Sequence, residues 1–267
     1  MKKQEKKFVL AGLVLLAAIT MVLLPLAGCK TEVDASSPQQ EWTGDDNNVN
    51  TDSKPCSHQS RADDGDCTTE VKCTVCGVEV GVIDGTLGGK TEATEEDLAA
   101  MVELLKSYIE NGHTTIIVTG SQPAKLLMSG YLTPIVSLAF EQLTYAYQDE
   151  KIDSYWGVVD LIYQDVTEIV EYEFYVCDVL KSITLPKVTT VGDRGFWACY
   201  YLETLTFGSV VTAINDNSGE VFYDLGYEIG GCNLVLNAEQ VNAATEYQPN
   251  VETKTWWNTE WKSITLE

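Results

Sequence analysis

Basic side chains are scarce in this sequence. It has 17 Lys and Arg residues against 40 Asp and Glu residues, so the formal net charge at pH 7 is −23. A chain with this charge repels the phosphates of nucleic acids and of anionic lipid surfaces. Nucleic-acid binding is therefore excluded, and a well-solvated acidic surface is expected, with basic partners preferred where a partner is charged.

Residues suited to acid–base or nucleophilic catalysis are also few. The chain has two histidines, His58 and His113, and it lacks the patterns of a nucleophile elbow, a phosphate-binding loop or a zinc-protease helix. His58 stands among cysteines, and His113 follows Asn111-Gly112, where a surface loop is expected. No spacing among the many carboxylates singles out a glycosidase pair. The sequence therefore predicts a protein that is not an enzyme.

The one long apolar run lies at the N-terminus. Four lysines within residues 1–7 precede the apolar stretch Phe8–Leu24, which Pro25 and Gly28 interrupt. A positive start, an apolar middle and small residues at the exit are typical of a signal peptide. An uncleaved membrane-spanning helix is the alternative, because about 20 apolar residues can cross a bilayer.

The end of this run, Leu26-Ala27-Gly28-Cys29, resembles the lipobox of bacterial lipoproteins. In that class the cysteine is acylated and becomes the first residue of the mature chain. The resemblance implies a signal peptide over residues 1–28 and a lipid anchor on Cys29, with ~0.8 kcal/mol of membrane affinity for each buried CH₂. We expect a bacterial membrane lipoprotein at the outer membrane, exposed on the cell surface.

Residues 29–55 are rich in Ser, Asp, Asn, Gln and Thr and carry few apolar side chains. Such a segment buries too little apolar surface to fold alone. We interpret it as a flexible tether between the lipid anchor and the rest of the chain.

Residues 56–80 combine cysteines with almost no apolar side chains, so this segment needs a metal or covalent bonds to hold its shape. Cys73-x-x-Cys76-Gly77 has the form of a zinc knuckle, and a structural zinc takes four ligands. Two disulfides are the alternative, since disulfides form outside the cytoplasm. The residues available for either arrangement are Cys56, His58, Cys67, Cys73 and Cys76.

The next part of the chain shows helical and strand patterns. Thr94 suits the N-terminal cap of a helix, three acidic residues follow it, and apolar side chains recur at helical spacing up to Asn111-Gly112. A short buried strand is predicted over residues 114–119. A second helix is predicted to begin at Thr133, with Pro134 at its first position.

From Val159 onward the sequence repeats itself with an offset of 22 residues. A period of about 20–29 residues with an LxxLxL pattern indicates a leucine-rich-repeat solenoid, in which each repeat adds one strand to a parallel sheet. Further strands are expected at residues 232–236 and 261–266, which makes about four in all. The matched pairs are Leu180–Leu185 with Leu202–Phe207, Val166–Ile169 with Val188–Val191, and Phe174–Cys177 with Phe196–Cys199.

The repeat pattern also divides side chains into those that face the core and those that face outward, because successive side chains of a strand alternate between its two faces. None of the repeats can bury its apolar face alone, so stacking supplies the missing contacts. The side chains predicted to point inward are Leu180, Ile183, Leu185, Val188, Val191, Phe196, Leu202, Leu205, Phe207 and Ile214.

The strand LKSITLP, the turn VTTVGDRGFWAC and the strand LETLTFGS resemble the BspA-like, Treponema-type leucine-rich-repeat surface proteins. The resemblance covers residues 159–267, and the family's N-terminal cap extends it to residue 94. It implies an α+β fold over 94–267: a short leucine-rich-repeat solenoid with a parallel β-sheet, capped N-terminally by two helices and a strand. Members of the family are secreted or lipid-anchored, and some are adhesins. Because this array is short and Arg194-Gly195 departs from the family pattern, the ligands of longer members are not carried over.

The outward positions of the repeat strands are the candidate binding face. They carry small hydroxyls and charges of both signs, which suits recognition of a protein or a glycan by a surface adhesin. A structural or accessory subunit of a surface complex that handles glycans is an alternative, and a merely solvated face is another. The face comprises Lys181, Ser182, Thr184, Glu203, Thr204 and Thr206, with Lys262, Ser263 and Thr265 beyond them.

Two further groups of side chains have competing interpretations. Cys177 and Cys199 stand one repeat apart, within reach of a disulfide, but buried free thiols packed as small apolar groups are the favoured interpretation. Trp256, Trp257 and Trp261 are expected to close the open end of the solenoid rather than to bind a ligand.

Overall fold

The computed structural model describes residues 61–62, 70–73, 79–128 and 130–267. The chain divides into two units, residues 1–51 and 52–267, and every described residue belongs to the second unit. The predicted signal peptide, the acylated Cys29 and the tether lie outside the described residues, as do the candidate zinc ligands Cys56, His58, Cys67 and Cys76. Cys73 ends a described strand, but its side chain lies outside the description.

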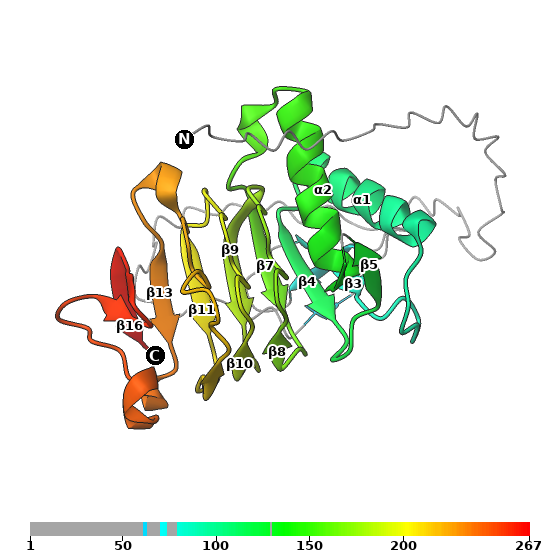
Figure 1. Cartoon of the computed structure of the whole chain (residues 1–267). Helices are drawn as coiled ribbons and strands as arrows, with labels where there is room; N and C mark the ends of the chain where they lie inside the picture. The colour runs from blue at the N-terminus through cyan, green and yellow to red at the C-terminus, as the bar shows by residue number, and fades with distance from the viewer. Residues whose placement is uncertain (1–60, 63–69, 74–78, 129) are drawn as a thin grey trace, which may run out of the picture. The chain divides into compact units, whose positions relative to one another are not determined.

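A nine-stranded sheet runs through the described unit in the order β1-β2-β3-β4-β7-β9-β11-β13-β16 (Figure 1). All pairings from β3 to β16 are parallel, whereas β1 with β2 and β2 with β3 are antiparallel. The strands are β1 Arg61–Ala62, β2 Glu70–Cys73, β3 Glu79–Asp84, β4 Thr115–Thr119, β7 Val159–Tyr163, β9 Leu180–Leu185, β11 Thr204–Phe207, β13 Asn233–Leu236 and β16 Ser263–Leu266.

The sheet joins parts of the sequence that were predicted to be separate. β3 lies N-terminal to residue 94, where the predicted domain begins, yet it pairs with β4. β2 in turn lies inside the predicted Cys/His segment and pairs with β3. The α+β prediction for the fold is confirmed, and the sheet begins earlier in the chain than residue 94.

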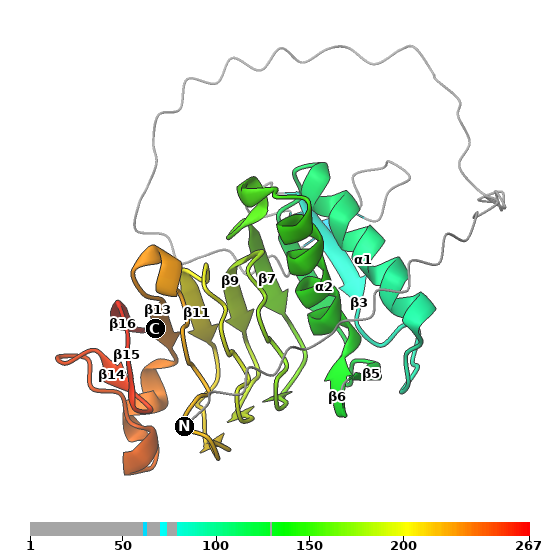
Figure 2. The ribbon, with the colours of Figure 1, turned by 45° about the horizontal axis from the view of Figure 1, so that its top comes forward.

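Two helices, α1 Glu95–Glu110 and α2 Ile135–Asp149, lie side by side on one face of the sheet near β3 and β4 (Figures 1 and 2). α1 begins as predicted: the Thr94 hydroxyl accepts a hydrogen bond from the Asp97 backbone, and the Asp97 carboxylate accepts one from the Thr94 backbone. We call residues 79–155, which contain these helices, the N-terminal cap.

The predicted start of the second helix at Thr133 is too early. β5 Lys125–Met128 pairs with β6 Tyr131–Pro134 in an antiparallel hairpin, which holds Thr133 and Pro134 in extended backbone. Pro134 therefore precedes α2 as its N-terminal cap residue, without a side-chain capping bond. Within the described residues, neither of the α-helices nor any shorter helix is long and apolar enough to span a bilayer.

One continuous core fills the space behind the sheet, from the helices of the N-terminal cap to the last repeat. Ile116, Val118 and Leu161 face the helices, and the same alternate positions continue along the sheet. All the side chains predicted to point inward are buried, none with more than 6% of its surface exposed. The stacked rings of Phe174, Phe196 and Phe222, with centroids 5.6 and 5.8 Å apart, form a ladder through three repeats.

The return segments of the repeats stack as the sequence offset predicts. β8 Glu168–Ile169, β10 Thr190–Val191 and β12 Ala213–Ile214 form a second, three-stranded parallel sheet. The left-handed backbone of Tyr172 recurs at Arg194, and that of Val176 recurs at Ala198. Equivalent residues thus share backbone conformation as well as position. We call residues 159–267 the repeat region.

The far end of the solenoid is closed by tryptophans. Trp256 and Trp261 are 1% and 3% exposed and pack against Phe222, and Trp256 also packs against Phe207, which confirms the predicted closure. Trp257 is half-buried and stacks on Tyr247. The closing segment contains an antiparallel hairpin of β14 Thr255–Trp256 with β15 Thr259–Glu260.

Four short 3-10 helices complete the described unit. They are η1 Asp153–Tyr155, η2 Tyr227–Ile229, η3 Ala238–Asn242 and η4 Thr245–Tyr247.

Candidate binding groove

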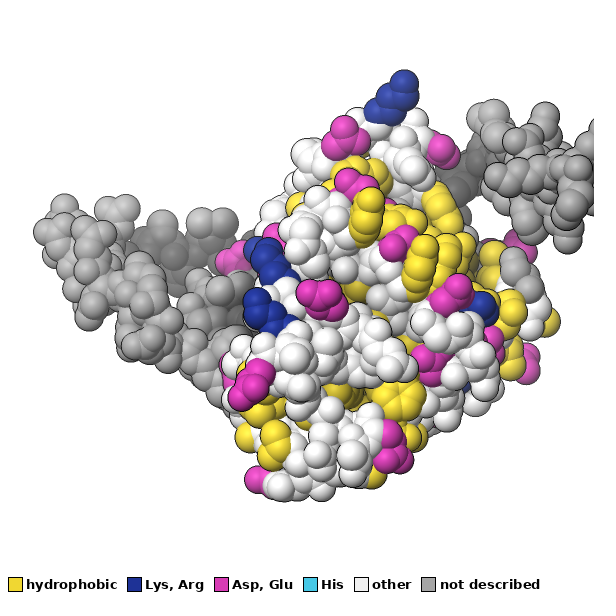
Figure 3. All heavy atoms as spheres, turned by 60° about the vertical axis from the view of Figure 1, so that its left-hand side comes forward, with side chains coloured by type: hydrophobic (Ala, Val, Ile, Leu, Met, Phe, Trp, Pro, Cys, Tyr) yellow, Lys and Arg dark blue, Asp and Glu magenta, His cyan; other side chains and the backbone are white. Residues whose placement is uncertain are grey.

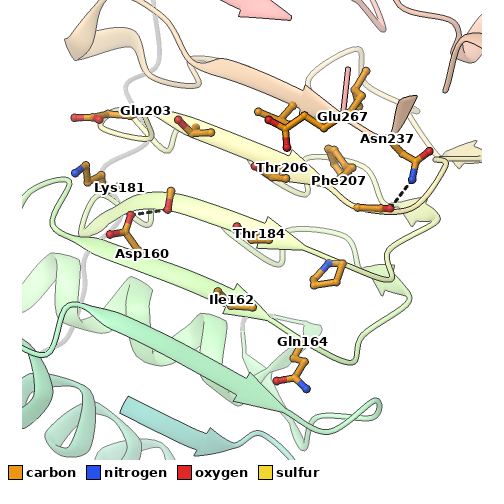
Figure 4. A pocket seen from close by; sticks show the side chains of 16 residues that line it. Asp160, Ile162, Gln164, Lys181, Thr184, Glu203, Thr206, Phe207, Asn237 and Glu267 are labelled. Atoms are coloured by element: carbon orange, nitrogen blue, oxygen red, sulfur yellow. Dashed lines mark hydrogen bonds between the residues drawn. The ribbon is translucent and has the colours of Figure 1, made fainter. Parts of the chain in front are cut away.

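The outward face of the repeat sheet is hollowed by a groove of about 460 Å³, which crosses β7, β9, β11 and β13 (Figure 4). Its floor consists of side chains that alternate with the buried ones, because neighbouring residues of a strand point to opposite faces. The lining residues are Asp160, Ile162, Gln164, Lys181, Ser182, Thr184, Pro186, Glu203, Thr204, Thr206, Phe207, Gly208, Val235, Leu236, Asn237 and Glu267.

The strand register arranges the floor in rows. One row, which we call the polar row, consists of Asp160, Ser182, Thr204, Asn233 and Ser263, paired in turn across neighbouring strands. The Ser182 hydroxyl donates a hydrogen bond of 2.6 Å to the Asp160 carboxylate. The Ser263 hydroxyl donates one of 2.8 Å to the side-chain oxygen of Asn233. The polar row is therefore partly fixed by its own hydrogen bonds before any ligand binds.

A second row lies two residues further along each strand, about 6.6 Å away. This row, which we call the methyl row, consists of Ile162, Thr184, Thr206, Val235 and Thr265, again paired across neighbouring strands. Every member is β-branched and offers at least one methyl group. The groove floor thus has a polar side and a side on which hydrocarbon is exposed.

Each end of the groove carries an acidic side chain, Glu203 at one and Glu267 at the other. Lys181 and Glu203 lie at the end where the strands begin, and Gln164 and Asn237 lie near the opposite end (Figure 4). A register shift pairs Val159 with Leu180 but Asp160 with Ser182, so Lys181 is the additional residue of a bulge. Bulges redirect side chains at sheet edges and functional sites.

Carboxylates outnumber cationic side chains in and around the groove. Asp160, Glu203 and Glu267 line it, against Lys181 as the lining cation. The face at the C-terminal end of the repeats likewise shows more acidic than basic side chains (Figure 3). The groove therefore lies in a negative field, which attracts cationic groups and repels anionic ones.

All six residues of the predicted binding face, Lys181, Ser182, Thr184, Glu203, Thr204 and Thr206, line the groove together. The residues of the last repeat follow in register, with Ser263 opposite Asn233 and Thr265 opposite Val235. Lys262 is exposed and precedes them.

Sequence reasoning missed the contribution of β7, because the number of repeat strands was predicted as four and is five. Asp160 and Ile162 on β7 both line the groove. The signal was available, because the offset of 22 residues applied backwards from Ser182 and Thr184 gives these two positions. No such signal marked Asn237 and Glu267. They follow β13 and β16, and these strands are not spaced by the 22-residue offset of the earlier repeats.

Cys177 and Cys199 are free, buried thiols, which agrees with the favoured interpretation, and Cys232 is a third. Burial raises the pKa of the Cys177 thiol well above its ordinary value, so it stays protonated. The Cys199 thiol donates a hydrogen bond of 3.2 Å to the Phe174 carbonyl oxygen. These thiols pack in the core, away from the groove.

Other candidate chemistry does not converge on the groove. Residues that line it include neither histidine nor cysteine. His113 lies in the turn after α1, with Nδ1 3.8 Å from the Glu79 carboxylate, and is partly buried rather than free on the surface. Across the described residues, no group of three or more His, Cys, Asp or Glu side chains could hold a metal ion. The zinc prediction itself lies outside these residues.

One buried carboxylate joins the N-terminal cap to the repeat region. Glu173 is 2% exposed, accepts a 2.8 Å hydrogen bond from the Val170 backbone and lies 3.4 Å from the Ser137 hydroxyl of α2. Burial raises its pKa from the usual 4.5 to about 7. A small hollow of about 60 Å³, lined also by Lys125 and Tyr163, lies beside it. Because the carboxylate holds two parts of the fold together, we assign it a structural role.

Comparison with known proteins identifies the repeats. Residues 159–224 match, in 6 copies, the family model described as BspA type leucine rich repeat region. The matched segment contains β7, β9 and β11 with their return strands, and it covers less than half of the chain. No curated protein and no solved structure matches the chain significantly. The repeat region of this protein is therefore similar to the BspA-type leucine-rich repeats.

Proposed function

We propose that this chain is a lipid-anchored bacterial surface protein that binds another macromolecule in the groove across its repeat sheet, as an adhesin or recognition module. The observation that carries the proposal is the groove itself: four strands present a hollow of about 460 Å³, with polar and methyl rows in register. Ligand sites are concave surfaces of this kind, with apolar contact area and a few placed polar groups.

The rest of the chain supports a display role. The lipobox-like Leu26-Ala27-Gly28-Cys29 and the polar residues that follow suit a protein anchored at Cys29 and held away from the bilayer. The residues that line the groove include neither histidine nor cysteine, and the Ser182 hydroxyl is paired with a carboxylate alone, so binding without catalysis is the function that its side chains suit.

The binding role is tested by filling the groove. Thr206 lies on the floor, so Thr206→Trp places an indole where the ligand is expected. The matched control is Thr245→Trp, because Thr245 is exposed on η4 and outside the groove. Full-length chain is screened against host matrix proteins and glycan arrays. Ligand binding that Thr206→Trp abolishes and Thr245→Trp preserves supports the proposal; binding that survives both substitutions overturns it.

The anchoring and display roles have a separate test. Cells that produce the wild-type chain are compared with cells that produce Cys29→Ser, using an alkyne-labelled fatty acid and protease treatment of intact cells. We expect label on the wild-type chain alone, and cleavage of the wild-type chain without cell lysis. A chain that is protected from protease in intact cells, but cleaved after lysis, would contradict surface exposure.

A further inference from the structure

Resting on the proposed function, we infer that the groove binds a polypeptide segment that carries Lys or Arg side chains together with aliphatic side chains, in preference to a glycan. The charge of the groove, the methyl row and the position of its aromatic ring each support this choice of ligand.

The charge of the groove favours a cationic ligand. Three carboxylates, those of Asp160, Glu203 and Glu267, line it against the single lining cation Lys181. One oxygen of the Asp160 carboxylate already accepts a hydrogen bond from the Ser182 hydroxyl, and its second oxygen can accept one from a ligand donor. A Lys or Arg side chain gains charge-assisted hydrogen bonds at such positions, whereas a neutral sugar hydroxyl gains weaker ones.

The methyl row favours a ligand with hydrocarbon side chains. Val235 is half-buried and exposes hydrocarbon at one end of this row within the groove, Ile162 at the other end lines the groove although it is only 9% exposed, and the methyl groups of Thr184 and Thr206 lie between them. Burial of an aliphatic side chain against these groups stabilises a complex by about 25 cal/mol for each Å² of apolar surface removed from water. A ligand with basic groups on one side and aliphatic groups on the other therefore satisfies both rows.

The aromatic content of the groove disfavours a glycan. Apolar faces of sugar rings pack on exposed aromatic faces, which supply large and rigid contact area. Phe207 is the aromatic residue among those that line the groove, and its ring is only 1% exposed because it packs against Phe196 and Trp256 in the core. The groove floor therefore offers hydroxyl, amide and methyl groups, but no ring face on which a sugar could stack.

The inference is tested with three synthetic peptides of equal length, and the full-length chain is titrated against each by fluorescence anisotropy. The first peptide alternates Lys and Leu, the second alternates Glu and Leu, and the third alternates Lys and Ser. The first should bind most tightly, because it alone matches both rows. The second should not bind detectably, and the third should bind at least about threefold more weakly than the first.

Variants separate the groove from the general negative field of a chain with a net charge of −23. The double variant Glu203→Gln with Glu267→Gln keeps side-chain shape and should weaken binding of the Lys–Leu peptide by about tenfold at low salt, and less at high salt. The matched control Glu103→Gln removes an exposed carboxylate from α1, outside the groove, and should change binding by less than about twofold. Val235→Thr should weaken binding of the Lys–Leu peptide and leave binding of the Lys–Ser peptide unchanged.

The results distinguish this inference from the proposed function. Binding of the Lys–Leu peptide that Thr206→Trp abolishes supports the inference. It is overturned if the Glu–Leu peptide binds equally well, or if Lys–Leu binding is insensitive to Thr206→Trp. It is also overturned if no peptide binds while a glycan or another protein is captured in a manner that Thr206→Trp abolishes; in that case the proposed binding function of the groove stands.

Discussion

In the repeat region, buried side chains at equivalent positions stack on one another, whereas in the N-terminal cap each buried side chain has surroundings of its own. Phe196 has Phe174 on one side and Phe222 on the other, with nearly parallel rings. Phe140 of α2 is equally buried but takes part in no comparable ladder among the described aromatic pairs. A solenoid builds its core by repeating one contact, and a cap must end that repetition with unique contacts.

This difference also separates two kinds of outward surface. The repeat region leaves one sheet face open, so polar and methyl rows extend across several strands. The N-terminal cap instead buries side chains of β3 and β4 on the outward face as well, where Val80 and Ile117 form a small cluster with Ile162 of the first repeat strand. The groove thus lies in the repeat region because register keeps its rows exposed there.

The largest effect on stability is expected from interrupting the ladder of stacked Phe rings. Phe196→Ala should lower the free energy of unfolding by about 5 kcal/mol, because it leaves a cavity and removes ring stacking on two sides. Phe140→Ala, as the matched substitution in the N-terminal cap, should lower it by about 3 to 4 kcal/mol. Urea unfolding followed by fluorescence measures both. Equal losses of unfolding free energy would show that ring stacking contributes no stability beyond that of burial, and the comparison between the two regions would fail.

The next effect concerns Glu173, which joins the two regions. Its pKa is raised by burial to about 7 from the usual 4.5, so the folded chain holds the proton more tightly than the unfolded chain. The stability that this proton contributes is fully present below pH 4.5 and is lost as the pH rises through about 7. The loss should amount to about 3 kcal/mol.

The test compares the pH dependence of unfolding in the wild-type chain and in Glu173→Gln, which has no titrating group. The wild-type free energy of unfolding should fall, relative to the variant, by about 3 kcal/mol between pH ~4 and pH ~8. Burial also raises the pKa of Glu141 to about 7 and that of Asp178 to about 6, so the variant should keep part of the slope. A constant difference between the two chains across this range would contradict the assignment.

A smaller effect is expected at the start of α1, which is specific to the N-terminal cap. Thr94→Ala removes the hydroxyl that accepts from the Asp97 backbone at 3.2 Å and should cost about 1 kcal/mol. Hydrogen exchange of the first-turn amides of α1 should accelerate about fivefold, while α2, which starts at Ile135 after Pro134 and has no side-chain cap, should not respond. Thr91→Ala, at an exposed position ahead of the helix, is the control; an equal response there would rule out a specific capping contribution.

The same comparison explains what the sequence could predict. In the repeat region, an assignment made for one repeat applies to equivalent residues of the others. The offset between Ser182 and Thr204 therefore predicted the strand register, the buried side chains and the outward face together. The hairpin of β5 and β6 was not foreseen, because its pairing depends on a turn at Gly130 with positive φ and on partners such as Leu127 and Leu132, whose exposed apolar side chains resemble core residues. Within the groove, six residues were predicted. Asp160 and Ile162 were missed although the offset of 22 residues marks them, and residues such as Asn237 and Glu267 were missed because no spacing marks them.

The smallest effect on stability is expected at the groove, and there it separates packing from binding. Thr206→Val replaces a hydroxyl by a methyl group on the outward face of β11, so the free energy of unfolding should change by less than about 0.5 kcal/mol. Leu205→Ala, one residue earlier and fully buried, should cost about 2 to 5 kcal/mol. Thr206→Val should nevertheless tighten binding of the Lys–Leu peptide, because it extends the apolar part of the methyl row between Ile162 and Val235. Stability and affinity measured on the same samples test both points, and a loss of stability comparable to that of Leu205→Ala would show that Thr206 belongs to the core rather than to an open binding face.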